Sequence, residues 1–267
     1  GVIRNRTPFL LLAVLLCVPL PSGCRSAHLT SVRPTGTITI DGLAGDWRQS
    51  QTYLDRQSMF VGVANDDSSL YILVKTIDLR AQKKVLELGL TMWISAEGNG
   101  KRRIGIHYPI GIEDTDIPVF GNDPPAPPSQ NQAKKILDAL SEMEIILPDE
   151  EPVRIPVSES RDVRVAVRDT SEMVVYELRV PLRRDQSPYG IISGGEEQIV
   201  IVAETGDIRP MMIRTGSDDG PRRRETTGMI RNKGRQTERP ERSPMVRMNP
   251  LAEPIKFTAN IRLAGVK

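Results

Sequence analysis

The chain has 267 residues, 39% hydrophobic and 26% charged, which is typical of a globular protein with a sizeable core. Its 36 basic and 34 acidic residues leave a formal net charge of +2, which argues against a dedicated nucleic-acid-binding protein. With two cysteines and two histidines, the chain has no disulfide framework and no cysteine-based zinc site, and a multi-histidine metal site is not expected either.

Residues 1–23 have the pattern of a secretory signal peptide. Two arginines precede an uncharged apolar run over residues 9–18, and Ser22-Gly23 supplies small residues before Cys24. The run is too short to span a bilayer, which takes about 20 residues. Both excess positive charges lie in this leader, so the mature chain is balanced, with 34 basic and 34 acidic residues.

The end of the leader resembles a lipobox, the recognition sequence of lipoprotein signal peptidase. Ser22-Gly23-Cys24 matches its last three positions, whereas Pro21 replaces the usual leucine. The resemblance implies cleavage before Cys24 and acylation of its thiol, and two or more acyl chains anchor a protein stably. The alternative is an ordinary signal peptide beside an incidental cysteine. Arg25 stands where inner-membrane lipoproteins typically carry aspartate, which implies the outer membrane of a Gram-negative cell envelope.

Residues 24–35 show little periodicity and are predicted to be a tether, and residues 36–267 are predicted to form one domain. From residue 36 onward, short alternating or apolar runs are separated by turn residues. The expected strands are 37–41, 59–64, 70–74, 88–95, 102–108, 163–167, 173–181, 198–203 and 255–263. This pattern favours an all-β antiparallel sandwich or barrel over alternating β–α units.

One segment departs from the strand pattern. Apolar residues recur at helical spacing, which predicts an inserted amphipathic helix over residues 129–144. Its apolar side is interpreted as packing against the sandwich, with a partner-binding surface as the alternative.

Residues 214–248 form a second irregular segment. They hold ten basic and five acidic residues and few large apolar ones, so they bury too little to offset their chain entropy. We expect a long disordered basic loop. It is either a solvated spacer or a contact with anionic lipid, lipopolysaccharide or acidic glycan.

Several motifs occur in the order found in one known group of domains. Ile38-Thr39-Ile40-Asp41-Gly42 followed by Asp46-Trp47, the hairpin over residues 63–72, and the Tyr176-Glu177 strand ending at Pro181 are similar to family 9 carbohydrate-binding modules and the wider DOMON-like sandwiches. The resemblance covers about residues 36–263 and implies a β-sandwich. It also implies a sugar ligand held between two aromatic side chains, with bound calcium supporting the fold, while related domains bind haem.

The sequence leaves several candidates for the residues that would contact such a ligand. Trp93, Tyr108 and Trp47 are the aromatic candidates, although Trp47 belongs to the opening motif and looks structural. The other tyrosines, Tyr53, Tyr71, Tyr176 and Tyr189, are further candidates.

Metal and haem ligands are scarce in this sequence. Asp66 and Asp67 could bind calcium through hard oxygen ligands, but turn formation alone explains them. His107 lies in a predicted strand, and an ordinary strand histidine is preferred over a haem ligand. We therefore expect no cofactor, with calcium as the alternative.

No catalytic motif is present: the sequence has no G-x-S-x-G, no H-E-x-x-H and no phosphate-binding loop. A carboxylate-based glycosidase remains the enzymatic alternative. The sequence thus favours a membrane-anchored lipoprotein with a non-catalytic ligand-binding sandwich, carbohydrate being the favoured ligand. The alternative is a structural or assembly lipoprotein that binds envelope proteins.

Overall fold

A computed structural model describes residues 26–47, 51–96, 104–111, 130–170, 172–206 and 253–265. Within these ranges two β-sheets pack face to face, so the predicted all-β sandwich is confirmed. The signal peptide, Cys24 and the basic segment 214–248 lie outside the described residues. Among the described residues, no helix has the length and apolar character needed to cross a bilayer.

The larger sheet, sheet A, has the strand order β1-β12-β11-β5-β6-β7-β8. All its neighbours pair antiparallel except β1 and β12, which pair parallel. The strands are β1 (Ala27–Thr30), β12 (Lys256–Arg262), β11 (Gln198–Thr205), β5 (Leu90–Ala96), β6 (Ile104–His107), β7 (Glu142–Ile146) and β8 (Val153–Pro156).

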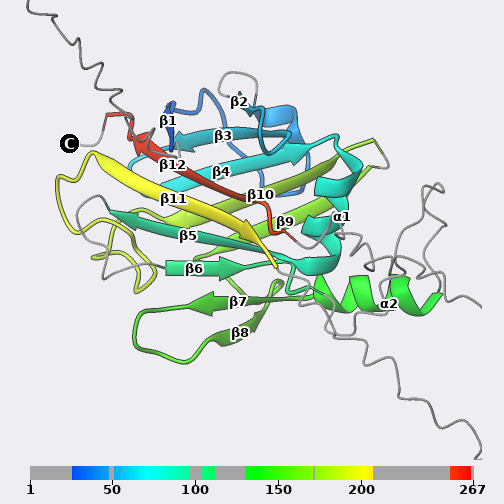
Figure 1. Ribbon diagram of the computed structural model, residues 1–267. Helices are drawn as coiled ribbons and strands as arrows, with labels where there is room; N and C mark the ends of the chain where they lie inside the picture. The colour runs from blue at the N-terminus through cyan, green and yellow to red at the C-terminus, as the bar shows by residue number, and fades with distance from the viewer. Residues whose placement is uncertain are drawn as a thin grey trace, which may run out of the picture.

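The smaller sheet, sheet B, is antiparallel throughout, with the order β2-β3-β4-β10-β9. In Figure 1 it lies behind sheet A. Its strands are β2 (Gln51–Leu54), β3 (Met59–Asn65), β4 (Ser69–Thr76), β10 (Val174–Pro181) and β9 (Arg164–Asp169).

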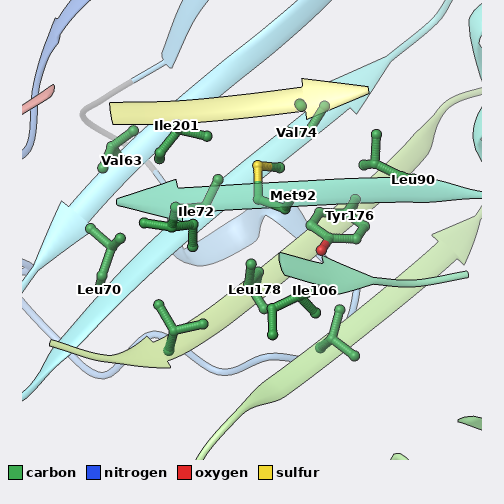
Figure 2. Packing of buried hydrophobic residues seen from close by; sticks show 14 of the residues in the cluster. Val63, Leu70, Ile72, Val74, Leu90, Met92, Ile106, Tyr176, Leu178 and Ile201 are labelled. Atoms are coloured by element: carbon green, nitrogen blue, oxygen red, sulfur yellow. The ribbon is translucent and has the colours of Figure 1, made fainter. Parts of the chain in front are cut away.

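The core lies between the sheets and follows from the alternation of side chains along each strand. Leu70 and Ile72 of β4 point from sheet B toward Met92 of β5 and Ile106 of β6 in sheet A (Figure 2). All four are fully buried. Burying an aliphatic side chain of this size contributes about 1.5–3 kcal/mol, so this interface is the main source of stability.

Two helices lie at one end of the sandwich (Figure 1). The predicted helix is present as α2 (Gln130–Ala139), but it is shorter than the expected 129–144, because residues 142–146 continue into sheet A as β7. The second helix, α1 (Leu79–Leu88), was not predicted. The Asp78 carboxylate caps it by accepting from the Ala81 amide at 2.8 Å, and Ala81 and Val85 pack into the core.

The predicted tether over residues 24–35 is wrong for its described part. Residues 27–30 form β1 and pair with β12, and Val32 forms an isolated bridge with Ala64 of β3. The Ser31 amide continues this pairing by donating to the Arg262 carbonyl at 2.9 Å. β12 thus supplies backbone hydrogen-bond partners for residues 27–31. The sequence of this segment has no periodicity, so it gives no sign of this pairing.

The strand expected at 37–41 is also absent. This segment is an irregular extended stretch, followed by a short 3₁₀ turn, η1 (Ala44–Asp46). The Thr39 amide donates to Asp46 in this turn, and the Asp41 amide donates to Glu177 of sheet B, so the segment does not need a neighbouring strand.

Candidate functional site

Trp93 lies on the outer face of sheet A. Met92 and Ile94 turn into the core, so strand alternation places the indole between them on the opposite face, where it is partly exposed. Its cross-strand neighbours are Gly105 on β6 and Val202 on β11. Sheet A stands in front of sheet B in Figure 1, so this outer face is the one toward the viewer.

The indole is held in one position by a glycine and a carboxylate. A Cβ at Gly105 would lie 2.6 Å from Trp93 Cζ3, 2.8 Å from Cε3 and 3.1 Å from Cη2, so the six-membered ring lies across this backbone. Trp93 Nε1 donates to Glu204 Oε1 on β11 at 2.9 Å. A fixed aromatic ring loses little conformational entropy when a ligand contacts it.

Beside the indole runs a row of polar side chains, one from each of several neighbouring strands. Glu204 Oε2 lies 2.9 Å from Lys256 Nζ on β12. His107 Nδ1 lies 2.9 Å from Glu144 Oε2 on β7, and Arg154 Nε of β8 donates to Glu144 Oε1 at 2.8 Å. We call Trp93, Gly105, His107, Glu144, Arg154, Glu204 and Lys256 the Trp93 face.

Electrostatics on this face favour an ionised Glu144. Burial acts to raise the pKa of Glu144, but hydrogen bonds from His107 and Arg154 outweigh burial and hold this pKa below its ordinary value. The side chains of His107 and Glu144 are 21% and 17% exposed, so the pair lies at the surface without projecting from it. The face therefore combines an aromatic ring with fixed donors and acceptors.

Trp47 is placed elsewhere. It is 3% exposed and packs on the outer side of sheet B with Ala64, Leu73 and Val175. Its Nε1 donates to Glu177 at 2.7 Å. The structural interpretation of Trp47 therefore fits the geometry, and the ring has almost no surface to offer a sugar.

Tyr108 is buried in the main core. It is 4% exposed, and its hydroxyl donates to the Leu140 carbonyl at 3.3 Å. Burial raises its pKa to about 12, opposed by a hydrogen bond with the Val167 backbone. The three predicted aromatic residues thus lie in three separate places, and of these three only Trp93 has an accessible ring.

Glu177 is the important residue that sequence reasoning missed. Its side chain is completely buried on the outer side of sheet B and accepts from Trp47 Nε1, from the Asp41 amide at 2.9 Å and from the Gly42 amide at 2.7 Å. Burial raises the pKa of Glu177, while the hydrogen bonds from Trp47 and the two amides oppose the shift. A glutamate inside the apolar run of residues 173–182 was the available signal.

The two aspartates considered for calcium make other contacts. Asp66 accepts from the amides of Ser68 and Ser69 at 2.8 and 2.7 Å and from the Tyr71 hydroxyl at 2.8 Å. Asp67 pairs with Arg33 at 2.6 Å. No group of three or more His, Cys, Asp or Glu residues in the described part of the chain could hold a metal ion. Turn formation accounts for the Asp66 bonds.

No model of a known protein family matches the chain, and no curated protein matches it. Among solved structures, the chain is similar to a carbohydrate binding module family 9 from Caldicellulosiruptor kristjanssonii in complex with glucose. The identity is 9% and the TM-score 0.29, over 68% of this chain and 78% of that chain. The sheets themselves define the class of this protein, an all-β two-sheet sandwich.

Proposed function

We propose that the protein is a non-catalytic glycan-binding module that binds through the Trp93 face. The observation that carries the proposal is the Trp93 indole, partly exposed and held against Gly105 on an outer sheet face. A pyranose ring has an apolar side of C–H groups and a periphery of hydroxyls. An aromatic ring packs against the first, and fixed polar groups hydrogen-bond the second.

The polar row beside Trp93 has the chemistry to recognise hydroxyls. Glu204 is 34% exposed and Lys256 is 59% exposed, so both retain contact with solvent while holding each other in place. The row continues through His107 and Glu144 to Arg154 on β8. An open sheet face of this kind suits an extended oligosaccharide more than a single enclosed sugar. Each exposed contact contributes little, so we expect modest affinity.

The test is glycan binding by the full chain and by Trp93→Ala, using soluble oligosaccharides in affinity electrophoresis. Loss of aromatic packing should weaken binding by about two- to twelvefold. Tyr53→Ala is the matched control, because Tyr53 is an aromatic side chain, 47% exposed, from the other sheet. Equal binding by Trp93→Ala and wild type would contradict the proposal, as would hydrolysis of a chromogenic glycoside.

The proposal includes no cofactor. The carboxylate oxygens of Asp66 are occupied by backbone amides and two hydroxyls, and Asp67 is paired with Arg33. Glycan binding should therefore be unchanged after dialysis against EDTA. A loss of binding that added calcium restores would contradict this part.

We also propose that acylated Cys24 anchors the domain to the outer membrane. Because β1 begins at Ala27, at most about 10 Å of extended chain separates the two residues, and the sandwich is held close to the bilayer. The Ser26 hydroxyl already accepts from Asn260 at 3.2 Å. Labelling with radioactive palmitate should follow the wild-type chain into the membrane fraction and be lost in Cys24→Ser. Label retained by Cys24→Ser would contradict the assignment.

The alternative function, binding to an envelope protein, stays a prediction, and α2 offers a place to test it. Leu137 on α2 is 67% exposed, and Lys134, Lys135 and Asp138 beside it are exposed as well. A single exposed leucine is common on protein surfaces, so Leu137 is only the point at which this candidate can be tested. Crosslinking in intact envelopes should then depend on Leu137, and a crosslinked product that persists in Leu137→Glu would contradict this candidate.

A further inference from the structure

A concave site separate from the Trp93 face lies at the end of the sandwich opposite the two helices. It is a cleft of about 390 Å³ where the start of β6, the turn between β7 and β8, and the connection from β10 to β11 meet. We call it the end cleft. Pockets of about 300–1,000 Å³ are the usual size for small ligands. None of the side chains of the Trp93 face lines it.

The inner wall of the end cleft is apolar and fixed. Ile104 and Ile191 line it and are 6% and 2% exposed, so they are part of the core. Tyr189, which is half-buried, provides an aromatic wall. Its amide donates to the buried Ser187 hydroxyl at 3.2 Å, and this hydroxyl donates to Asp162 at 2.7 Å. The backbone that carries the ring is therefore held before any ligand arrives.

The rim of the end cleft carries charge of both signs. Asp149 and Glu150 are exposed in the turn between β7 and β8, and Arg184, which is half-buried, also lines the cleft. The Arg184 amide donates to the Ile192 carbonyl at 3.0 Å, and its guanidinium also interacts electrostatically with Glu196. The lining thus has two carboxylates and one guanidinium, and the guanidinium also interacts with Glu196. The net charge of the lining is therefore negative.

We propose that the end cleft binds a small sugar that carries a protonated amine, of the chemical class of glucosamine. Tyr189 would pack against the C–H side of the ring, and cations are attracted to the face of an aromatic ring. Asp149 and Glu150 would pair with the ammonium group, and Arg184 would donate to ring hydroxyls. This site goes beyond the proposed function of the Trp93 face, because the end cleft lies away from that face and selects its ligand by a positive charge.

The experiment is a set of NMR titrations of the ¹⁵N-labelled full chain with glucosamine, glucose and glucuronate. Glucosamine should shift the amide signals of Tyr189 and Ile191 saturably. Glucose should bind about tenfold more weakly because it lacks the ammonium group, and glucuronate should give no saturable shift. Raising the salt concentration should weaken glucosamine binding, since exposed charges are screened.

Substitutions can remove the negative charge of the cleft rim without affecting the stability of the fold. The double substitution Asp149→Asn with Glu150→Gln should weaken glucosamine binding about five- to twentyfold without lowering the Tm. Asparagine suits position 149, where φ is +62°, because Asn and Asp both tolerate this left-handed conformation. Asp55→Asn, in the exposed turn between β2 and β3, is the matched control and should bind as wild type.

The outcomes also separate the two sites. Trp93→Ala should leave the glucosamine shifts at Tyr189 unchanged, whatever its effect on oligosaccharide binding. Equal affinity for glucose and glucosamine, or unchanged glucosamine binding in the Asp149→Asn, Glu150→Gln variant, would overturn the amine specificity. Shifts confined to residues outside the end cleft would overturn the site itself.

Discussion

At the scale of single residues, the contacts of two side chains explain features of this chain that pattern alone left open. Trp93 has its position on sheet A because Gly105 leaves room for its ring and Glu204 fixes its nitrogen. Glu177 links the opening motif to the late strand, since it accepts from Trp47 and from the backbone at Asp41 and Gly42.

Adding one methyl group at Gly105 tests the position of the indole. In Gly105→Ala the new Cβ would lie 2.6 Å from Trp93, so the ring must move off the sheet. We expect glycan binding to weaken and the free energy of unfolding to fall by about 1–3 kcal/mol, as for other overpacked sites. Tryptophan emission and the Tm report the two effects. Gly45→Ala is the control, because a Cβ there has no atom within 4 Å, and equal behaviour of the two variants would contradict the prediction.

Replacing the Glu177 carboxylate tests its structural role. In Glu177→Gln an amide NH₂ group must face at least one of the donors that the carboxylate now accepts from. We expect a loss of about 1–3 kcal/mol in the free energy of unfolding, measured by urea denaturation. Glu159→Gln, at an exposed position, should change stability by less than about 0.5 kcal/mol. A Glu177→Gln variant as stable as this control would show that the buried hydrogen bonds contribute nothing.

At the scale of elements, β1 is part of the fold because its end is bonded to two other strands. The Ala264 amide, just beyond β12, donates to Ser31 Oγ and to Asn65 Oδ1, both at 2.8 Å. Asn65 Nδ2 returns a hydrogen bond to the Ala264 carbonyl at 3.1 Å, and Ser31 Oγ donates to Asn65 Oδ1. Asn65 is completely buried, and through these hydrogen bonds it joins the ends of β1, β3 and β12.

Asn65→Ala should therefore loosen β1 more than the rest of the sandwich. Removing a buried amide leaves the Ser31 hydroxyl and the Ala264 groups short of a partner, which costs about 1–3 kcal/mol. Hydrogen exchange should accelerate in residues 27–30 before it does in β5. Thr52→Ala, at an exposed position on β2 in the other sheet, is the control. Unchanged exchange in β1 would refute the role assigned to Asn65.

At the scale of the whole molecule, Glu144 and Glu177 make the free energy of unfolding depend on pH in opposite directions. The pKa of Glu144 is lowered from 4.5, so its contribution is fully present above about pH 4.5 and is lost as the pH falls through the folded-state pKa. Burial raises the pKa of Glu177 above 4.5, so the folded state binds this proton more tightly than the unfolded state does. The stability that this proton adds is therefore present below about pH 4.5 and is lost as the pH rises through the folded-state pKa.

Acid titration of stability separates these contributions. Between about pH 5 and about pH 3, the free energy of unfolding of Glu144→Gln should fall less steeply than that of the wild type, because the variant has no carboxylate to protonate. Urea denaturation across this range measures the slope. Glu142→Gln, two residues earlier on the same face of β7, is the matched control. Identical slopes for wild type and Glu144→Gln would contradict the assignment of the lowered pKa.

The sequence by itself determined the class of fold and the place of most strands. Alternation along a strand is local, so the sequence indicates that Trp93 lies on the opposite side from Met92 and Ile94, but only the packing of the two sheets shows which side is the core. It did not determine which strands pair, because parallel pairing of β1 with β12 joins segments more than 220 residues apart. Nor did it place Trp47, Tyr108 or Glu177. Whether an aromatic ring is covered or a carboxylate is bonded depends on contacts between distant segments, and only the tertiary structure supplies them.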